Sequence, residues 1–324
     1  MNVQTIFFAQ GRLRAIWRFL FSALAIVASV IAIQILLGIV LGLAGTKPTF
    51  FLANSLTAFL TLPVLLGLVA FFTRVFEERP FGSAGMAMSG RWKAELALGL
   101  AIGTMMTLAV AGLEWALGAA RFSWSGEELK LLCLWGGGSF VVLTFAATNE
   151  EIIFRGYPFQ RLVESIGAPG AILILSVLFG AIHLSNPNST WVGAANTSLV
   201  GVPFSIAYLR TRMLWLPIGM HFAWNFVLGF VLGLPVSGIT FPVTLLRAED
   251  AGPTVLTGGA YGPEAGLLAT GVIVLATGYL AVSRSIYVSD DTRALLVGPA
   301  KTPAPEEASA HLEKPGPARG EMTS

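Results

Sequence analysis

Three ionisable side chains, those of Glu150, Glu151 and Arg155, stand near the end of a long apolar run of the sequence. An ionisable side chain at membrane depth is costly unless it has a partner, faces protein or lines a wet cavity. His183 and His221 follow in later apolar runs. Carboxylates and imidazoles can together move a proton and stabilise developing negative charge. The pattern therefore indicates a polar functional site inside an apolar protein.

Spacing assigns different roles to the two carboxylates. Adjacent side chains on a helix point about 100° apart, so Glu150 and Glu151 are predicted not to face the same cavity. Glu151 and Arg155 are four residues apart, the spacing at which a carboxylate and a guanidinium meet on one helix face. We interpret this pair as structural. Glu150 is then left free for general acid or base work, and Pro158 is predicted to end or kink the helix.

The same spacing recurs in two later apolar runs. His183 comes four residues after Phe179, and Asn225 comes four residues after His221. We expect these polar side chains to face Glu150. A histidine bonded to a neighbouring helix is also a common packing feature, but the joint occurrence of these groups favours a functional site over packing.

The composition is that of a membrane protein. Of the 324 residues, 55% are hydrophobic and 12% are charged, whereas soluble domains average about 25% charged. Repeated apolar stretches of about 20 residues match the thickness of a bilayer. The net charge of +2 offers no basic patch for nucleic acid. The single cysteine, Cys133, excludes an internal disulfide and a cysteine metal cluster.

We expect an all-α, polytopic bundle of eight transmembrane helices, near residues 19–43, 50–72, 94–117, 131–154, 170–184, 191–209, 214–234 and 266–282. If both termini are cytoplasmic, all but four of the 20 Lys and Arg residues lie on the inner side, as the positive-inside rule requires. The four outer residues are then Lys47, Arg121, Lys130 and Arg247.

Four regions are predicted along the chain. Residues 1–18 form a cytoplasmic segment, residues 19–130 a three-helix membrane region, residues 131–288 a catalytic membrane core, and residues 289–324 a disordered cytoplasmic tail. Residues 235–266 are too long for a simple hairpin and are predicted to cap the bundle or to re-enter it. Glu95 and Glu114 stand near helix ends and are interpreted as packing or interface residues.

Three motifs in order, Glu150-Glu151-x-x-x-Arg155, Phe179-x-x-x-His183 and His221-x-x-x-Asn225, resemble those of the CPBP family. This family comprises CAAX prenyl endopeptidases and proteins of bacteriocin processing or self-immunity. The resemblance covers about residues 131–234 and leaves the first three spans and the tail unconstrained. It implies an eight-helix intramembrane endopeptidase whose cavity opens toward the cytoplasm.

The resemblance also implies roles for single residues. Glu150 and His183 would activate the attacking water, while His221 and Asn225 would form the oxyanion site. The other motif residues, Glu151, Arg155 and Phe179, would support them. These roles agree with the chemistry of peptide hydrolysis, which needs a base near the water and donors near the developing negative charge.

The need for a metal stays open at this stage. Glu150, His183 and His221 are the ligand types of a catalytic zinc site, and the family has been described as metalloproteases. The His-Glu-x-x-His signature of zinc proteases does not occur in the sequence. We therefore favour a mechanism without a cofactor, with zinc as the alternative.

The predicted function is cleavage of membrane-associated peptides or small proteins, a class that includes prenylated and CAAX-like substrates, in a bacterial inner membrane. Two alternatives come from other classes. A non-catalytic immunity or interaction protein could use the polar cluster for structure. A proton-coupled transporter could use buried Glu and His as a proton relay, although the sequence carries no obvious internal repeat of the kind common in transporters.

Overall fold

The computed structural model describes residues 6–9, 11–88 and 90–297. The long helices are α2 (Ala15–Leu43), α3 (Phe50–Glu77), α4 (Trp92–Ala116), α5 (Leu129–Arg155), α6 (Tyr157–Ile182), α7 (Trp191–Thr211), α8 (Trp215–Phe226) and α10 (Leu267–Val282). A π-helical turn, η3 (Val227–Val231), continues α8. Each of the predicted spans falls on one of these helices, and the protein is an all-α membrane bundle.

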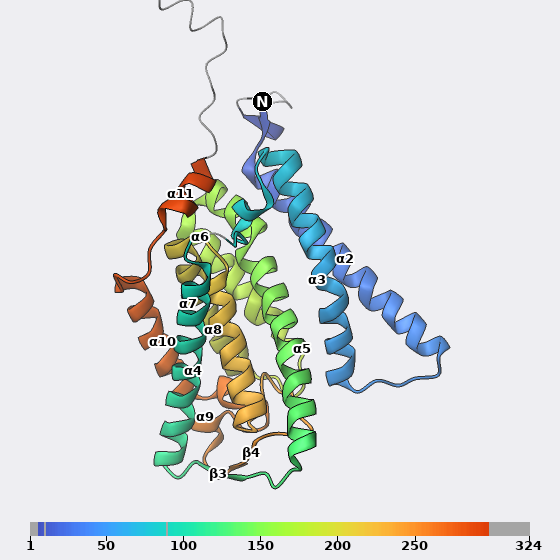
Figure 1. The fold of residues 1–324 in the computed structure, drawn as a ribbon, viewed down its shortest axis with the longest axis vertical. Helices are drawn as coiled ribbons and strands as arrows, with labels where there is room; N and C mark the ends of the chain where they lie inside the picture. Colours follow the sequence, from blue (N-terminus) through green and yellow to red (C-terminus); the bar gives the residue numbers. More distant parts are fainter. Residues whose placement is uncertain (1–5, 10, 89, 298–324) are drawn as a thin grey trace, which may run out of the picture.

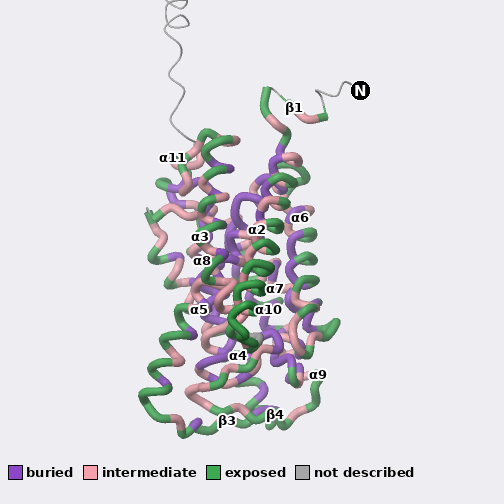
Figure 2. Tube along the Cα trace, turned by 90° about the vertical axis from the view of Figure 1, so that its right-hand side faces the viewer, coloured by how far each residue is buried: buried purple, intermediate pink, exposed green. Residues whose placement is uncertain are grey.

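Length and composition support membrane insertion. Five helical stretches are long and apolar enough to cross a bilayer, and one of them, Leu129–Ser185, contains both α5 and α6. Two shorter apolar helices cover Trp215–Val231 and Leu267–Val282. Large apolar side chains of α2, such as Leu24 and Leu36, are exposed, while buried residues gather inside the bundle (Figure 2). The exposed apolar faces are suited to contact lipid.

The helices are arranged as a bundle with a hairpin on one side. The hairpin is formed by α2 and α3, and α2 leans away from the other helices (Figure 1). Inside the bundle α4 packs against α8, and α6 packs against α7. The first described residues and the short helix α11 (Asp290–Val297) lie at one end, and the strands β3 (Ala120–Trp124) and β4 (Leu246–Asp250) lie at the other.

Glycines allow α4 and α8 to approach closely. A Cβ atom added to Gly99 would overlap the carbonyl oxygen of Leu216, and one added to Gly103 would overlap that of Met220. The same close approach is found from the side of α8, because a Cβ added to Gly219 would overlap the backbone of α4. Small residues at helix contacts are a common means of close packing in membranes. This contact fixes the position of α8, which carries His221.

The chain breaks its helix directly after the first motif. The helix α5 ends at Arg155, and α6 begins at Tyr157 with Pro158 in its first turn. The predicted effect of Pro158 is thus confirmed. A second bend within α6 occurs at Gly167, whose φ of 81° is left-handed. The 3₁₀ turn η2 (His183–Ser185) follows α6 and places His183 at its first position.

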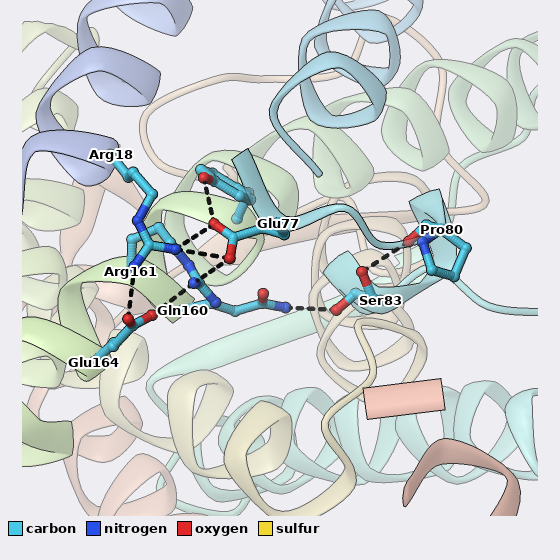
Figure 3. Close-up of polar contacts among 8 residues, drawn as sticks. Arg18, Glu77, Pro80, Ser83, Gln160, Arg161 and Glu164 are labelled. Carbon is cyan, nitrogen blue, oxygen red and sulfur yellow. Dashed lines mark hydrogen bonds and ion pairs between the residues drawn. The ribbon is translucent and has the colours of Figure 1, made fainter. Parts of the chain in front are cut away.

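A polar network joins α2, α3 and α6 near the end of the bundle where the N-terminus lies (Figure 3). Glu77 accepts hydrogen bonds from Arg18 at 2.6 Å, from Arg161 at 2.9 Å and from Tyr157 at 2.8 Å. Both arginines also pair with Glu164. Because the carboxylate of Glu77 is nearly buried and shared by two cations, the network anchors the hairpin to the bundle.

Residues 235–266 cover the end of the bundle opposite to β1 (Phe8–Ala9) and β2 (Arg12–Leu13) (Figure 1). They contain β4, α9 (Thr254–Thr257) and the 3₁₀ turns η4 (Gly259–Tyr261) and η5 (Pro263–Ala265), and β4 pairs antiparallel with β3. A further short element is η1 (Phe81–Ala84). The predicted cap is therefore present, and it includes a small sheet that sequence reasoning did not foresee.

The predicted tail begins with regular structure. Asp290–Val297 is helical, and Ser289 accepts a hydrogen bond from the backbone N–H of Thr292 at 3.3 Å, which caps this helix. The predicted boundary at residue 289 therefore does not mark the end of helical structure. Residues 298–324 of the predicted tail lie outside the described residues.

Candidate active site

Both motif carboxylates of α5 approach the ring of His221. Its Nδ1 lies 2.8 Å from Oε1 of Glu151, and its Nε2 lies 3.7 Å from Oε2 of Glu150. The two carboxylates leave the helix in different directions, as the spacing predicts, and they reach different nitrogens of the ring. An imidazole has nitrogens on two sides of its ring, so carboxylates that leave the helix in different directions can both reach it.

Arg155 holds the fully buried carboxylate in place. Its Nη1 lies 3.1 Å from Oε1 of Glu151, and its Nη2 donates to the carbonyl oxygen of Gly201 at 3.3 Å. The ion pair expected from the spacing is therefore present. The guanidinium also lies over the rings of Phe179, at 4.7 Å, and Phe204, at 5.3 Å. Aromatic faces attract a cation, so these rings lower the cost of burying it.

Aromatic rings fix the plane of His221. Phe204 of α7 stacks on the imidazole at a centroid distance of 5.3 Å, and Phe179 of α6 meets it edge-on at 6.1 Å. With Glu151 bound at Nδ1, the ring is held from three sides. The side chain of His221 is therefore positioned by α5, α6 and α7 together.

His183 approaches from the end of α6. Its Nδ1 lies 2.7 Å from the carbonyl oxygen of Phe179. A carbonyl can only accept, so Nδ1 carries the proton of this bond and Nε2 is left free to act as an acceptor when the ring is neutral. Phe179 also packs edge-on against the imidazole at 4.8 Å. One phenylalanine thus positions both histidines.

The two histidines line one cavity with a volume of about 30 Å³. Its walls come from α6, α7, α8 and α10 and from residues 235–266, and they include Phe179, His183, Phe204, His221, Trp224 and Glu264. Glu150 is half-buried and borders this site through His221. Asn225 lies one turn beyond His221 on α8 and is also half-buried. The catalytic and supporting roles assigned to these residues stay predictions.

Glu264 is a cavity residue that sequence reasoning left unassigned. Its Oε1 accepts a hydrogen bond from Nε1 of Trp224 at 3.0 Å. Its Oε2 accepts from the hydroxyl of Ser237 at 2.8 Å and from the Ser237 backbone N–H. Burial raises the pKa of the Glu264 carboxyl, while the bonds from Ser237 and Trp224 act in the opposite direction. These contacts tie the covering segment to α8.

Asn196 of α7 fastens the same segment. Its amide donates to the carbonyl oxygens of Glu264, at 2.9 Å, and Gly266, at 3.0 Å. Its own oxygen accepts from the hydroxyl of Thr270 at 2.7 Å. No spacing rule links Asn196 to Glu264, which lies 68 residues further along the chain, so the sequence carries no signal for this contact.

The zinc alternative depends on where the candidate ligands lie in the structure. Within residues 6–9, 11–88 and 90–297, no group of three His, Cys, Asp or Glu side chains is arranged to hold a metal ion. The hydrogen bonds at Nδ1 of His221 and of His183 leave Nε2 of each ring without a hydrogen bond among the described residues. The zinc alternative with Glu150, His183 and His221 as ligands stays a prediction, and we derive no step through a metal.

Comparison with known proteins supports the motif assignment. Residues 133–227 match the family model described as type II CAAX prenyl endopeptidase Rce1-like. This match agrees with the resemblance of the same segment to the CPBP family. The matched segment contains all seven motif residues, which are Glu150, Glu151, Arg155, Phe179, His183, His221 and Asn225. It ends before the covering segment that carries Glu264.

Comparison with known proteins also finds a similar bacterial protein. The chain is 37% identical over 76 residues to a Bacillus subtilis protein named "Putative membrane peptidase YdiL". The alignment covers 24% of this chain and 29% of that relative. No solved structure matches the chain significantly. The protein is thus a multi-pass membrane protein, and its residues 133–227 are similar to a family of membrane endopeptidases.

Proposed function

We propose that the protein is an intramembrane endopeptidase that hydrolyses peptide bonds of membrane-associated peptides by a glutamate mechanism without metal. The observation that carries this proposal is the position of His221. Its ring lies between Glu151 and Glu150 on the wall of a cavity that His183 also lines. A base, two imidazoles and an apolar cavity wall are the components that peptide hydrolysis at a membrane needs.

The chemical steps follow from these groups. A water molecule between Glu150 and His183 loses a proton to the Glu150 carboxylate while its oxygen bonds to the carbonyl carbon of the substrate. The carbonyl oxygen becomes negative and accepts hydrogen bonds from the amide of Asn225 and, in its doubly protonated form, from Nε2 of His221. The C–N bond then breaks, and the proton on Glu150 passes to the leaving amine. Glu151 and Arg155 bind no substrate atoms and keep His221 in place.

The substrate class rests on the surroundings of the site. Apolar side chains make up much of the cavity wall, including Phe179, Val200, Phe204 and Ile273. Such a wall favours peptides that already lie at the membrane, with prenylated or CAAX-like peptides among the candidates. The proposed location is a bacterial inner membrane with the cavity open to the cytoplasm.

The test compares the purified wild type with Glu150→Gln on a library of quenched peptides that includes farnesylated C-terminal peptides. We expect Glu150→Gln to cleave at least about 100-fold more slowly, and Glu128→Gln, at an exposed position at the start of the same helix, to retain wild-type activity. Equal cleavage by wild type and Glu150→Gln would reject the proposal in favour of a non-catalytic protein. Flux of solutes in proteoliposomes without any cleavage would favour a transporter.

A chelator addresses the metal question in the same assay. The reaction contains low micromolar zinc, and we expect cleavage to continue after a strong chelator is added to bind it. Loss of cleavage that zinc alone restores would overturn the metal-free mechanism while leaving the peptidase proposal in place.

A further inference from the structure

A second cavity lies at the end of the bundle that carries β3, β4 and α9 (Figure 1). Its volume is about 300 Å³, and its walls include Glu114, Gly233, Pro235, Asp250, Thr257 and Gly262. None of these residues lines the cavity of the two histidines. The two cavities lie on either side of residues 235–264, since Ser237 and Glu264 face one and Pro235 and Pro263 face the other.

Glu114 is a buried carboxyl group in this wall without a protein partner. The residue is 1% exposed, and neither of its carboxylate oxygens has a hydrogen-bond partner among the described residues. A buried carboxylate left unpaired costs several kcal/mol. A group of this kind, facing a cavity large enough for ions and water, requires a ligand or a proton.

The surroundings of Glu114 favour a positively charged ligand. Glu114 stands in the last turn of α4, where the helix dipole disfavours negative charge. The charged group that acts on it is another carboxylate, that of Asp250. The residues lining the cavity include no Lys, Arg or His. The described lining therefore supplies two carboxyl groups and no cation of its own to offset them.

Asp250 is held in an orientation that leaves lone pairs available. Its Oδ1 accepts from the backbone N–H of Gly252 at 3.2 Å, and its Oδ2 accepts from the hydroxyl of Thr257 at 3.1 Å. A carboxylate oxygen has more than one lone pair, so each remains able to bind a cation. The other lining residues from the covering segment are chiefly Gly, Pro and Ala, which offer backbone carbonyl oxygens.

We propose that this cavity binds a divalent cation of the calcium type, with the carboxylates of Glu114 and Asp250 as its charged ligands and with backbone carbonyl and water oxygens completing the coordination. Calcium accepts six to eight oxygen ligands in irregular geometry, whereas magnesium requires a small octahedral shell. An irregular Gly-rich loop that faces two carboxylates fits the coordination of calcium. Bound calcium would connect α4 to the end of β4 and would stabilise the segment that carries Glu264.

The test uses the purified full-length protein in detergent, stripped with a chelator and dialysed against radioactive calcium. We expect one saturable calcium site per chain, with affinity at least about tenfold weaker in Glu114→Gln and in Asp250→Asn. Matched controls are Glu249→Gln, which neighbours Asp250 on β4, and Glu95→Gln, a buried carboxyl at the other end of α4. Both controls should bind calcium as the wild type does.

Thermal unfolding gives a second readout that does not depend on peptidase activity. At a calcium concentration about 100 times the dissociation constant, the wild type should unfold roughly 5 °C higher, and the two site variants should show no shift. Asp250 is exposed, so its variant remains informative if Glu114→Gln does not fold. Absence of saturable calcium binding, or equal binding by the wild type and both variants, would overturn the proposal, because Glu114 would then hold a proton instead. Equal affinity for magnesium would overturn the assignment to calcium.

Discussion

The ring of His221 is bonded through Nδ1 to Oε1 of Glu151 at 2.8 Å, across 70 residues of sequence. Because a carboxylate can only accept, the imidazole must keep a proton on Nδ1, and its Nε2 is the nitrogen directed toward Glu150. The contact therefore sets both the orientation of the ring and the position of its protons. Under the proposed mechanism it also gives the two adjacent glutamates separate roles, since Glu151 orients the histidine and Glu150 serves the substrate.

Replacing Glu151 should impair turnover more than substrate binding. In Glu151→Gln the charge that holds the Nδ1 proton is lost, and we expect kcat to fall by about 100-fold or more with little change in KM, as for other carboxylates that orient a histidine. Steady-state kinetics measures both constants. Glu164→Gln, at a half-exposed carboxylate of the polar network, is the control and should keep wild-type kcat. An unchanged kcat in Glu151→Gln would contradict the orienting role.

Replacing Arg155 should destabilise the fold. Arg155→Met would leave the fully buried Glu151 carboxylate without its ion-pair partner, and we expect a loss of about 3 to 5 kcal/mol in the free energy of unfolding. Denaturant titration in detergent measures this loss. Arg74→Met, at an exposed position of α3, serves as the control. The double variant Glu151→Gln/Arg155→Met should recover part of the stability, whereas additive losses would show that the two side chains are not coupled.

Replacing Glu264 should weaken the attachment of the covering segment. In Glu264→Gln the amide NH₂ group would face hydrogen-bond donors of Ser237 or Trp224. We expect a loss of about 1 to 3 kcal/mol in the free energy of unfolding. The loss should concentrate in residues 235–266, where hydrogen exchange measured by mass spectrometry would rise. Equal exchange in this segment in wild type and variant would contradict the attachment. Glu249→Gln, on the same segment and exposed, is the matched control.

Adding a methyl group between α4 and α8 should separate the helices. Gly99→Ala would place its Cβ against the carbonyl oxygen of Leu216, and we expect a loss of about 1 to 3 kcal/mol from overpacking. Gly112→Ala lies on the same helix with open space around its Cβ and should instead gain about 0.5 to 1 kcal/mol. Thermal unfolding of the two variants in parallel decides the matter, and similar stability in both would show that the helix contact is not tight.

Local features of the fold were predictable from the sequence because they depend on local physics. Apolar runs about as long as a bilayer is thick located the spans. The four-residue spacing of Glu151 and Arg155 predicted their ion pair, in which Nη1 and Oε1 are 3.1 Å apart. Pro158 marked the end of α5 because proline lacks the N–H that a helix interior needs.

The remaining contacts depend on how distant helices pack, which spacing rules do not address. Trp224 and Glu264 are 40 residues apart, and Arg18 and Glu77 are 59 residues apart. The angle between adjacent helical side chains suggested separate sites for Glu150 and Glu151, but the reach of the side chains and the two nitrogens of His221 brought both to one ring. The position of Glu114 near a helix end predicted a packing residue, and spacing rules could not indicate its cavity because the loop that forms much of the wall lies more than 100 positions later.

The Arg155 pair has a consequence for assembly in the membrane. A chain is made from its N-terminus, so α5 reaches the bilayer before Gly201 and His221, which lie 46 residues after Arg155 and 70 residues after Glu151. During that interval the partner of each charge is on its own helix, one turn away. The neighbouring pair thus lets α5 enter the bilayer with these two charges matched before α7 and α8 are made. The cluster around His221 is completed only when those helices arrive.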